Sequence, residues 1–141
     1  MNPLFKLFIA AHIRLYRATG GRIGSSMMGA RVLLLTTTGN KSGQPRTVPL
    51  MTFSDGDQDY IVASNNGAPG DPAWYKNLKT RPEVTVQLGA RIFGATAVTA
   101  PDEERDRVYR GIAAKMKNFA AYEKKAAPRK IPIVRLVPIS G

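Results

Sequence analysis

The chain contains no cysteine, and His12 is the only histidine among its 141 residues. The absence of cysteine excludes disulfides, thiolate nucleophiles and every metal site that needs a cysteine ligand. A single histidine also leaves no histidine-rich centre within one chain, so no metal site is expected. A protein without disulfides suits a reducing compartment, and we expect the chain to be cytoplasmic.

Acidic residues are scarce too, and none precedes Asp55. The chain has 21 Lys plus Arg against 10 Asp plus Glu, which gives a formal net charge of +11. The first part of the chain therefore contains only cations among its charged side chains. The positive electrostatic field of these cations attracts phosphates, nucleic acids, anionic lipids or acidic small molecules. The charge alone does not show which of these the protein binds.

The apolar stretch at the N-terminus is too short to cross a membrane. Residues 2–18 have the pattern of a helix with a broad apolar face, interrupted by Lys6, Arg14 and Arg17. A helix of that length spans about 25 Å, less than the roughly 30 Å hydrocarbon core. Two interpretations stay open, a helix packed on the domain or a basic amphipathic helix lying on a membrane surface. His12 is expected to be a packing or surface residue and not to take part in chemistry.

The rest of the chain has the pattern of short strands separated by turns. Apolar and β-branched runs predict strands at 31–38, 47–53, 60–64, 84–88, 92–99 and 131–136. Helices are expected at 73–79, with Asp71 as N-cap and Pro72 at the first helical position, and at 101–116. Turns connect most of these strands, which disfavours a doubly wound nucleotide-binding fold. We predict a mainly β (α+β) domain at 30–141, a small barrel of about six mostly antiparallel strands with peripheral helices, after an N-terminal helical segment at 1–29.

The loop at 40–46 contains the densest set of anion-binding groups. Its glycines let backbone amides turn inward, and the donors are Lys41, Ser42, Gln44 and Arg46. Oriented amides and cations together suit a phosphate or a carboxylate. The glycine-to-lysine spacing is not that of a P-loop. The alternative is a polar hairpin turn that happens to be basic.

A second polar stretch follows the predicted strand at 60–64, and Trp74 lies a few residues beyond it. Hydroxyls and amides at a strand end commonly line a pocket, and a nearby aromatic ring can cover a planar ligand. The alternative for Trp74 is a place in the core. Ser64 has no base to activate it, because His12 lies in an apolar helix, so no catalytic triad is available. The prediction that remains is a protein that positions an organic cofactor.

Two motifs in order are similar to those of one known family. Residues 34–46, LLTTTGNKSGQPR, followed by Pro49 and Leu50, resemble the first signature of the deazaflavin-dependent nitroreductases. Residues 72–78, PAWYKNL, resemble the second signature at the expected distance. The resemblance implies a single split β-barrel that binds coenzyme F420, a 5-deazaflavin with a phosphate and an oligoglutamate tail. It also implies hydride transfer from reduced F420 to a quinone, an enone or a nitroaromatic compound.

The resemblance implies a role for individual residues as well. The phosphate and tail would be held by Lys41, Ser42, Gln44 and Arg46. The deazaflavin would be lined by Pro49, Leu50, Met51, Ala63, Ser64 and Asn65, and supported by Trp74, Lys76 and Asn77. The substrate pocket would contain Met116, Phe119 and Tyr122, with Tyr122 or Ser64 as the catalytic proton donor. Phe119 stands where nitroreducing relatives have a tyrosine, and its side chain donates no proton.

Two other functions stay open at this point. The first is an oxidoreductase of the same barrel class that binds flavin mononucleotide, whose shorter anionic tail needs fewer cations. The second is a basic module that binds lipid surfaces. Nucleic acid is not an expected partner, because no helix-turn-helix is present and Trp74 is not interleaved with cations along an exposed strand. We expect a monomer whose partner is a small hydride acceptor, with peripheral membrane contact through the N-terminal helix.

Overall fold

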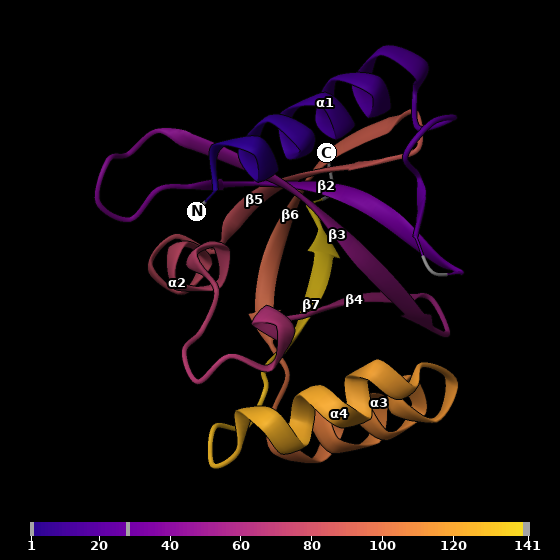
Figure 1. Cartoon of the computed structure of the whole chain (residues 1–141), viewed down its shortest axis with the longest axis vertical. Coiled ribbons are helices and arrows are strands. Elements are labelled where there is room, and N and C mark those ends of the chain that lie inside the picture. Colours follow the sequence, from indigo (N-terminus) through magenta and orange to yellow (C-terminus); the bar gives the residue numbers. More distant parts are fainter. Residues whose placement is uncertain (1, 28, 140–141) are drawn as a thin grey trace.

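A computed structural model describes residues 2–27 and 29–139 and shows a closed antiparallel barrel with helices at two sides (Figure 1). The barrel strands are β2 (Ala30–Thr38), β3 (Pro45–Asp55), β4 (Gln58–Val62), β5 (Glu83–Leu88), β6 (Arg91–Thr99) and β7 (Ile133–Pro138). They follow one another in the order β2-β3-β4-β7-β6-β5, and pairing of β2 with β5 closes the barrel. A short strand, β1 (Ser26–Met27), pairs with the start of β2. The predicted barrel class is confirmed.

The helices lie outside this barrel. They are α1 (Pro3–Thr19), α2 (Ala73–Thr80), α3 (Asp102–Lys115) and α4 (Lys117–Ala126), with a short 3-10 turn, η1 (Asn65–Gly67), after β4. In Figure 1, α1 crosses one end of the barrel, and α3 and α4 cover the opposite end. None of the helices in residues 2–27 and 29–139 is long and apolar enough to cross a membrane.

Strand β2 is buried on both faces, which explains its almost continuous apolar sequence. Leu33 and Leu35 pack inside the barrel, while Val32 and Leu34 pack against Tyr16 of α1. The Tyr16 hydroxyl donates to the Val32 carbonyl oxygen at 2.9 Å and accepts from the Gly89 amide at 2.8 Å. These contacts attach the C-terminal half of α1 to the barrel.

The helical region before β7 differs from the prediction. One helix was expected at 101–116, but the structure has α3 and, after a break at Met116, the additional helix α4. α4 is short, and short helices gain most of their stability from tertiary packing. Here the packing comes from Phe119 and Ala126, which are buried against the barrel. The local sequence pattern alone was therefore insufficient to predict α4.

The predicted N-cap of α2 is also wrong. Pro72, not Asp71, occupies the N-cap position, and no side chain caps the helix. The Asp71 carboxylate instead accepts a hydrogen bond at 3.0 Å from Arg129, far away in sequence. The Asp71 carboxylate is thus paired with a largely buried cation and not with the helix terminus.

Candidate active site

Strand β3 exchanges one strand partner for another near its end. β3 pairs with β2 from Thr52, opposite Arg31, to Pro45, opposite Thr38, whereas β4 pairs with β3 only at residues 53–55. Residues 45–52 therefore have one edge without a strand partner in the described part of the chain. Pro49, which has no N–H to donate, lies within this stretch. An open edge leaves backbone donors and acceptors available to a ligand.

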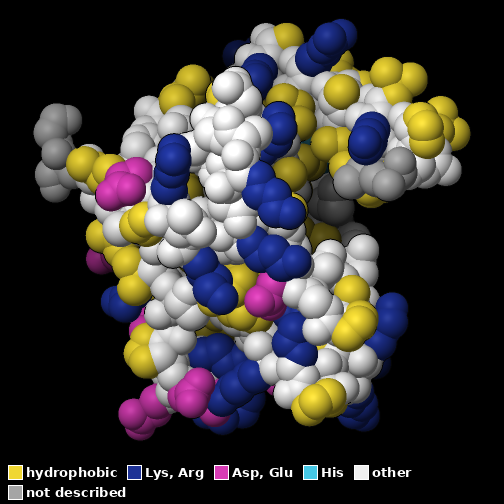
Figure 2. All heavy atoms as spheres, turned by 90° about the vertical axis from the view of Figure 1, so that its left-hand side faces the viewer, with side chains coloured by type: hydrophobic (Ala, Val, Ile, Leu, Met, Phe, Trp, Pro, Cys, Tyr) yellow, Lys and Arg dark blue, Asp and Glu magenta, His cyan; other side chains and the backbone are white. Residues whose placement is uncertain are grey.

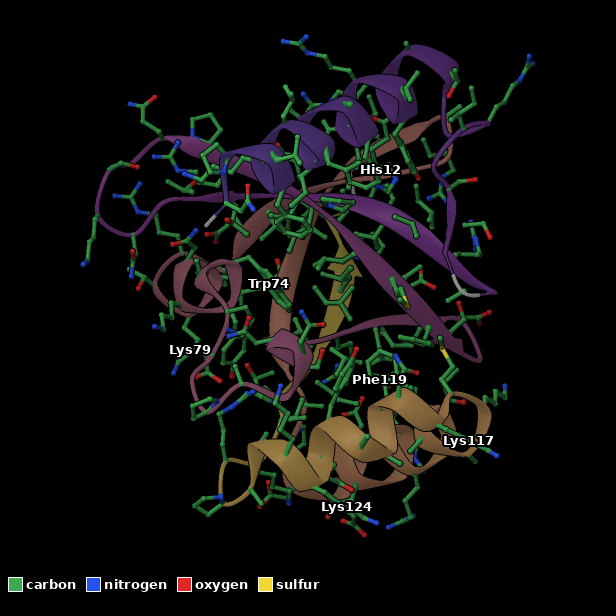
Figure 3. All side chains as sticks on the ribbon, in the orientation of Figure 1. His12, Trp74, Lys79, Lys117, Phe119 and Lys124 are labelled. Carbon is green, nitrogen blue, oxygen red and sulfur yellow. The ribbon has the colours of Figure 1, made fainter. Side chains whose placement is uncertain are left out.

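A cleft with a volume of about 190 Å³ lies beside this open edge, between β3 and α4. We call it the β3–α4 cleft. Its lining includes six of the residues implied by the family motifs, namely Pro49, Leu50, Met51, Ser64, Phe119 and Tyr122. Five lining residues were not predicted as site residues, namely Val32, Phe53, Val62, Asn66 and Asn118. Phe119 projects from α4 towards the barrel (Figure 3), and the same side of the molecule is hollowed between α1 and α4 (Figure 2).

One wall of the cleft is aromatic. Phe119 packs edge-to-face on Phe53 at 5.5 Å and on Tyr122 at 5.4 Å between ring centroids. The backbone of Phe119 is fixed by Tyr109, whose hydroxyl donates to the Phe119 carbonyl oxygen at 2.6 Å. Burial raises the pKa of Tyr109 to about 12, so this donor keeps its proton at neutral pH. The wall therefore offers the planar apolar surface of the Phe119 and Tyr122 rings.

The cleft is also lined by a loop with an unusual backbone, which lies against α4. Asn65, Asn66 and Gly67 have φ values of 51°, 54° and 77°, in the left-handed region that asparagine and glycine tolerate best. A Cβ on Gly67 would lie 3.1 Å from the Tyr122 Cα, so glycine is what lets α4 approach this closely. The loop places Ser64 and Asn66 in the cleft, whereas the Asn65 amide turns away and donates to the Gly70 carbonyl oxygen at 3.0 Å.

Arg129, which no local sequence pattern indicated, holds this loop in place. Its side chain is only 13% exposed. Nη2 donates to the carbonyl oxygens of Ser64 at 2.9 Å and Ala68 at 2.8 Å, and Nε donates to Ala68 at 3.1 Å. Nη1 donates to the Ala63 carbonyl oxygen at 3.2 Å and to the Asp71 carboxylate at 3.0 Å. All donor atoms of the guanidinium are thereby used to position the loop that contains Ser64.

The basic loop between β2 and β3 is fastened to α2. The buried Asn77 side chain donates to the Thr37 hydroxyl at 3.1 Å and accepts from the Asn40 amide at 3.0 Å. Within the loop, the Ser42 hydroxyl accepts from the Gln44 amide at 3.1 Å and from Arg46 at 3.4 Å. Asn77 thus acts here as a structural support of the loop.

The cations of this region point into solvent. Lys41, Arg46 and Lys76 are exposed, and none of them forms an ion pair with a carboxylate of the described residues. Figure 2 shows Lys and Arg side chains along this face, beside the hollow between α1 and α4. The loop leads directly into β3, the strand that contains Pro49, Leu50 and Met51 of the cleft.

Besides Asn65, other residues implied by the resemblance lie outside the cleft. Trp74 is buried in the barrel core with Leu33, and Ala63 is completely buried. Neither side chain lines the cleft, and Trp74 occupies the core position that was its alternative interpretation. Met116 lines a neighbouring pocket and not the cleft itself.

Comparison with known proteins identifies the family of this chain. The model of the F420H(2)-dependent quinone reductase family matches residues 9–138. The chain belongs to this family. The F420H(2)-dependent quinone reductase of Mycobacterium tuberculosis strain H37Rv is 41% identical over 128 residues, which cover 89% of this chain and 86% of the relative.

Two solved structures agree with this assignment. An F420-H2 dependent reductase is 37% identical and covers 74% of this chain and 92% of its own, with a TM-score of 0.66. A second structure, described as a domain-swapped dimer, is 31% identical and covers 96% of this chain and 99% of its own, with a TM-score of 0.70. Family membership confirms the predicted F420H2-dependent reductase and its cofactor class. The monomer expected for this chain is not supported by this second structure, which is described as a dimer.

Proposed function

We propose that the β3–α4 cleft holds the deazaflavin ring of F420 and that a quinone receives the hydride there. The observation that supports this most is the open edge of β3 beside an aromatic wall. A planar ring with polar edges suits both surfaces, because backbone groups bond its edge and Phe119 packs on its face. The exposed Lys41, Arg46 and Lys76 suit a phosphate and an oligoglutamate tail.

Each part of the site then has a defined task. Reduced F420 supplies the hydride when it is bound. The backbone of residues 49–51 orients the ring, and Phe119 with Leu50 excludes water from the reacting face. A quinone that accepts a hydride also needs one proton to become a hydroquinone. Tyr122 lines the cleft, and its hydroxyl is the proposed donor, while Ser64 polarises the acceptor oxygen.

Binding of F420 by the purified protein, followed by calorimetry, tests the site. We expect saturable binding of F420 that is at least tenfold tighter than that of flavin mononucleotide. Asn118→Trp should weaken F420 binding at least tenfold, because Asn118 lines the cleft. Ala121→Trp is the matched control, since Ala121 lies on the same helix and is exposed. Tighter binding of flavin mononucleotide, or equal effects of both variants, would contradict the proposal.

The proton donor is tested by Tyr122→Phe. This variant keeps the ring that packs on Phe119 but removes the hydroxyl, so F420 affinity should stay within twofold. We expect kcat for quinone reduction to fall on the order of 10²-fold, as for loss of a general acid. Ser64→Ala should lower kcat less. A fall of kcat in Ser64→Ala alone would move the donor role to Ser64, and unchanged kcat in both variants would leave protonation to solvent.

We further propose that the start of α1 contacts an anionic membrane surface. Leu4, Leu7 and Phe8 are 73%, 67% and 70% exposed. Figure 2 shows hydrophobic side chains at its upper right, where α1 begins. Lys6 and Arg14 lie on the same helix, and no acidic residue accompanies them. An apolar face with cations is the usual arrangement of a helix that lies on lipid.

Sedimentation with vesicles tests this contact. The triple variant with serine at positions 4, 7 and 8 should lose at least tenfold in binding to phosphatidylglycerol vesicles, with turnover of soluble quinones unchanged. Ile92→Ser removes another exposed apolar side chain, from β6, and should have no effect. If the triple variant binds vesicles normally but changes from dimer to monomer, the apolar face is a subunit interface instead.

A further inference from the structure

Two neighbouring asparagines after β4 use their side chains differently. Asn65 and Asn66 both have a left-handed backbone conformation, with φ values of 51° and 54°. The Asn65 side-chain amide donates to the Gly70 carbonyl oxygen and so helps to shape the loop. Asn66 lines the β3–α4 cleft, and its side chain forms no hydrogen bond with any of the described residues. The Asn66 amide is therefore available to a ligand.

The backbone at position 66 would suit glycine better than asparagine. Glycine enters the left-handed region without steric cost, whereas a residue with a Cβ is strained there. The surrounding structure holds Asn66 in this conformation, because Lys125 Nζ donates to the Asn66 carbonyl oxygen at 3.3 Å. Arg129 holds the carbonyl oxygens of Ser64 and Ala68 on either side of it. A side chain kept at a strained position beside a ligand cleft points to a role in binding.

The cleft offers polar groups without charged ones. No lysine, arginine, aspartate or glutamate of the described residues lines it. Its polar lining residues are Ser64, Asn66, Asn118 and Tyr122. Hydroxyl and amide groups donate hydrogen bonds to a carbonyl oxygen and need no counter-charge in an apolar cleft. This lining therefore suits an acceptor that presents carbonyl groups.

A 1,4-quinone presents two carbonyl oxygens on opposite sides of its ring, and reduction turns both into hydroxyls. Electron density therefore rises on both oxygens as the hydride arrives, and a hydrogen-bond donor at each oxygen stabilises the transition state. In the proposed function, Tyr122 and Ser64 act on one of these oxygens. The second oxygen still needs a donor in the cleft.

We infer that the Asn66 side-chain amide donates a hydrogen bond to the second carbonyl oxygen of a 1,4-quinone, which makes its contribution specific to para-quinones. This inference rests on the proposed function. Asn66 transfers no proton, and the hydride and one proton complete the hydroquinone as described above. In an ortho-quinone the two carbonyl groups are adjacent, so Ser64 and Tyr122 serve both and the Asn66 amide contributes little.

Kinetics with one quinone of each kind test this inference. The probes are 2-methyl-1,4-naphthoquinone and 1,2-naphthoquinone. Asn66→Gly removes the amide at a position whose φ suits glycine, so the variant is expected to fold. We expect kcat/KM to fall at least tenfold with the para-quinone and less than twofold with the ortho-quinone, while the affinity for F420 changes less than twofold. Asn66→Asp keeps the shape but accepts a hydrogen bond instead of donating one, and should lower kcat/KM for the para-quinone at least as much.

Asn65→Gly is the matched control, because it makes the same substitution at the adjacent left-handed residue, whose amide turns away from the cleft. Any effect of this variant should be equal for the two quinones. Equal losses for both quinones in Asn66→Gly, or no loss for either, would overturn the inference. A loss selective for the para-quinone in Asn65→Gly would do the same, as would a wild-type protein that reduces only the ortho-quinone. If the wild-type protein reduces neither quinone, the proposed function itself is contradicted.

Discussion

Replacement of Arg129 by methionine is expected to lower the free energy of unfolding by about 3 kcal/mol and to remove most F420 binding. Methionine keeps an unbranched apolar chain over the inner part of the arginine side chain but donates no hydrogen bond. The carbonyl oxygens of Ala63, Ser64 and Ala68 would then lose a largely buried partner, and the Asp71 carboxylate would lose its cation. The loop of left-handed residues at 65–67 depends on these bonds, so Ser64 and Asn66 would leave their positions in the cleft.

Urea unfolding and calorimetric titration of F420 measure the two effects separately. Lys130→Met is the matched control, since Lys130 is the next residue and forms only solvent-exposed ion pairs with Asp102 and Asp106. It should bind F420 like the wild type. Arg129→Lys keeps the charge but not the planar fork, and should recover stability in part without full affinity. Normal F420 affinity in a folded Arg129→Met protein would show that the loop does not need this arginine.

Removing the positive charge of Lys41 and Arg46 together is expected to weaken F420 binding on the order of 10²-fold, since charge-assisted hydrogen bonds are the strong ones. The variant is Lys41→Gln with Arg46→Gln, which keeps a polar, uncharged side chain at both positions. Both cations are exposed, so the remaining affinity should also respond less to salt than that of the wild type. Stability should hardly change, because neither side chain forms an ion pair within the described residues.

A control with the same change in net charge separates local contacts from the general positive field. Lys117→Gln with Lys124→Gln removes two cations of α4, both of which project away from the barrel (Figure 3). This second double variant should bind F420 within about twofold of the wild type. Equal losses in the two double variants, measured at two salt concentrations, would mean that the β2–β3 loop is not a specific anion site.

Sequence patterns predicted the barrel well because its signals are local. Apolar β-branched runs and glycine-containing turns fix most strands within a few residues, and the motif at 34–46 indicates the basic loop. Arg129 could not be found in this way, because its partners at Ala63, Ser64 and Ala68 precede it by about sixty positions. The same holds for Asn118, whose place in the cleft depends on the unexpected helix α4.

Trp74 illustrates a different limit. The second family motif includes it, and a motif does not say whether a residue contacts the ligand or supports the fold. The structure places Trp74 in the barrel core. Asn77, on the same helix, contacts the basic loop by accepting a hydrogen bond from the Asn40 amide. Fluorescence of Trp74 therefore reports on the core more than on the cleft.

The measurement that tests the central claim most directly is anaerobic oxidation of F420H2 by 2-methyl-1,4-naphthoquinone in the presence of the purified protein. The proposed site predicts formation of oxidised F420 that depends on the protein, saturates with both reactants and is at least tenfold slower in Asn118→Trp. Reduced flavin mononucleotide should not replace F420H2. No acceleration over the protein-free reaction, or equal activity with the reduced flavin, would contradict the account.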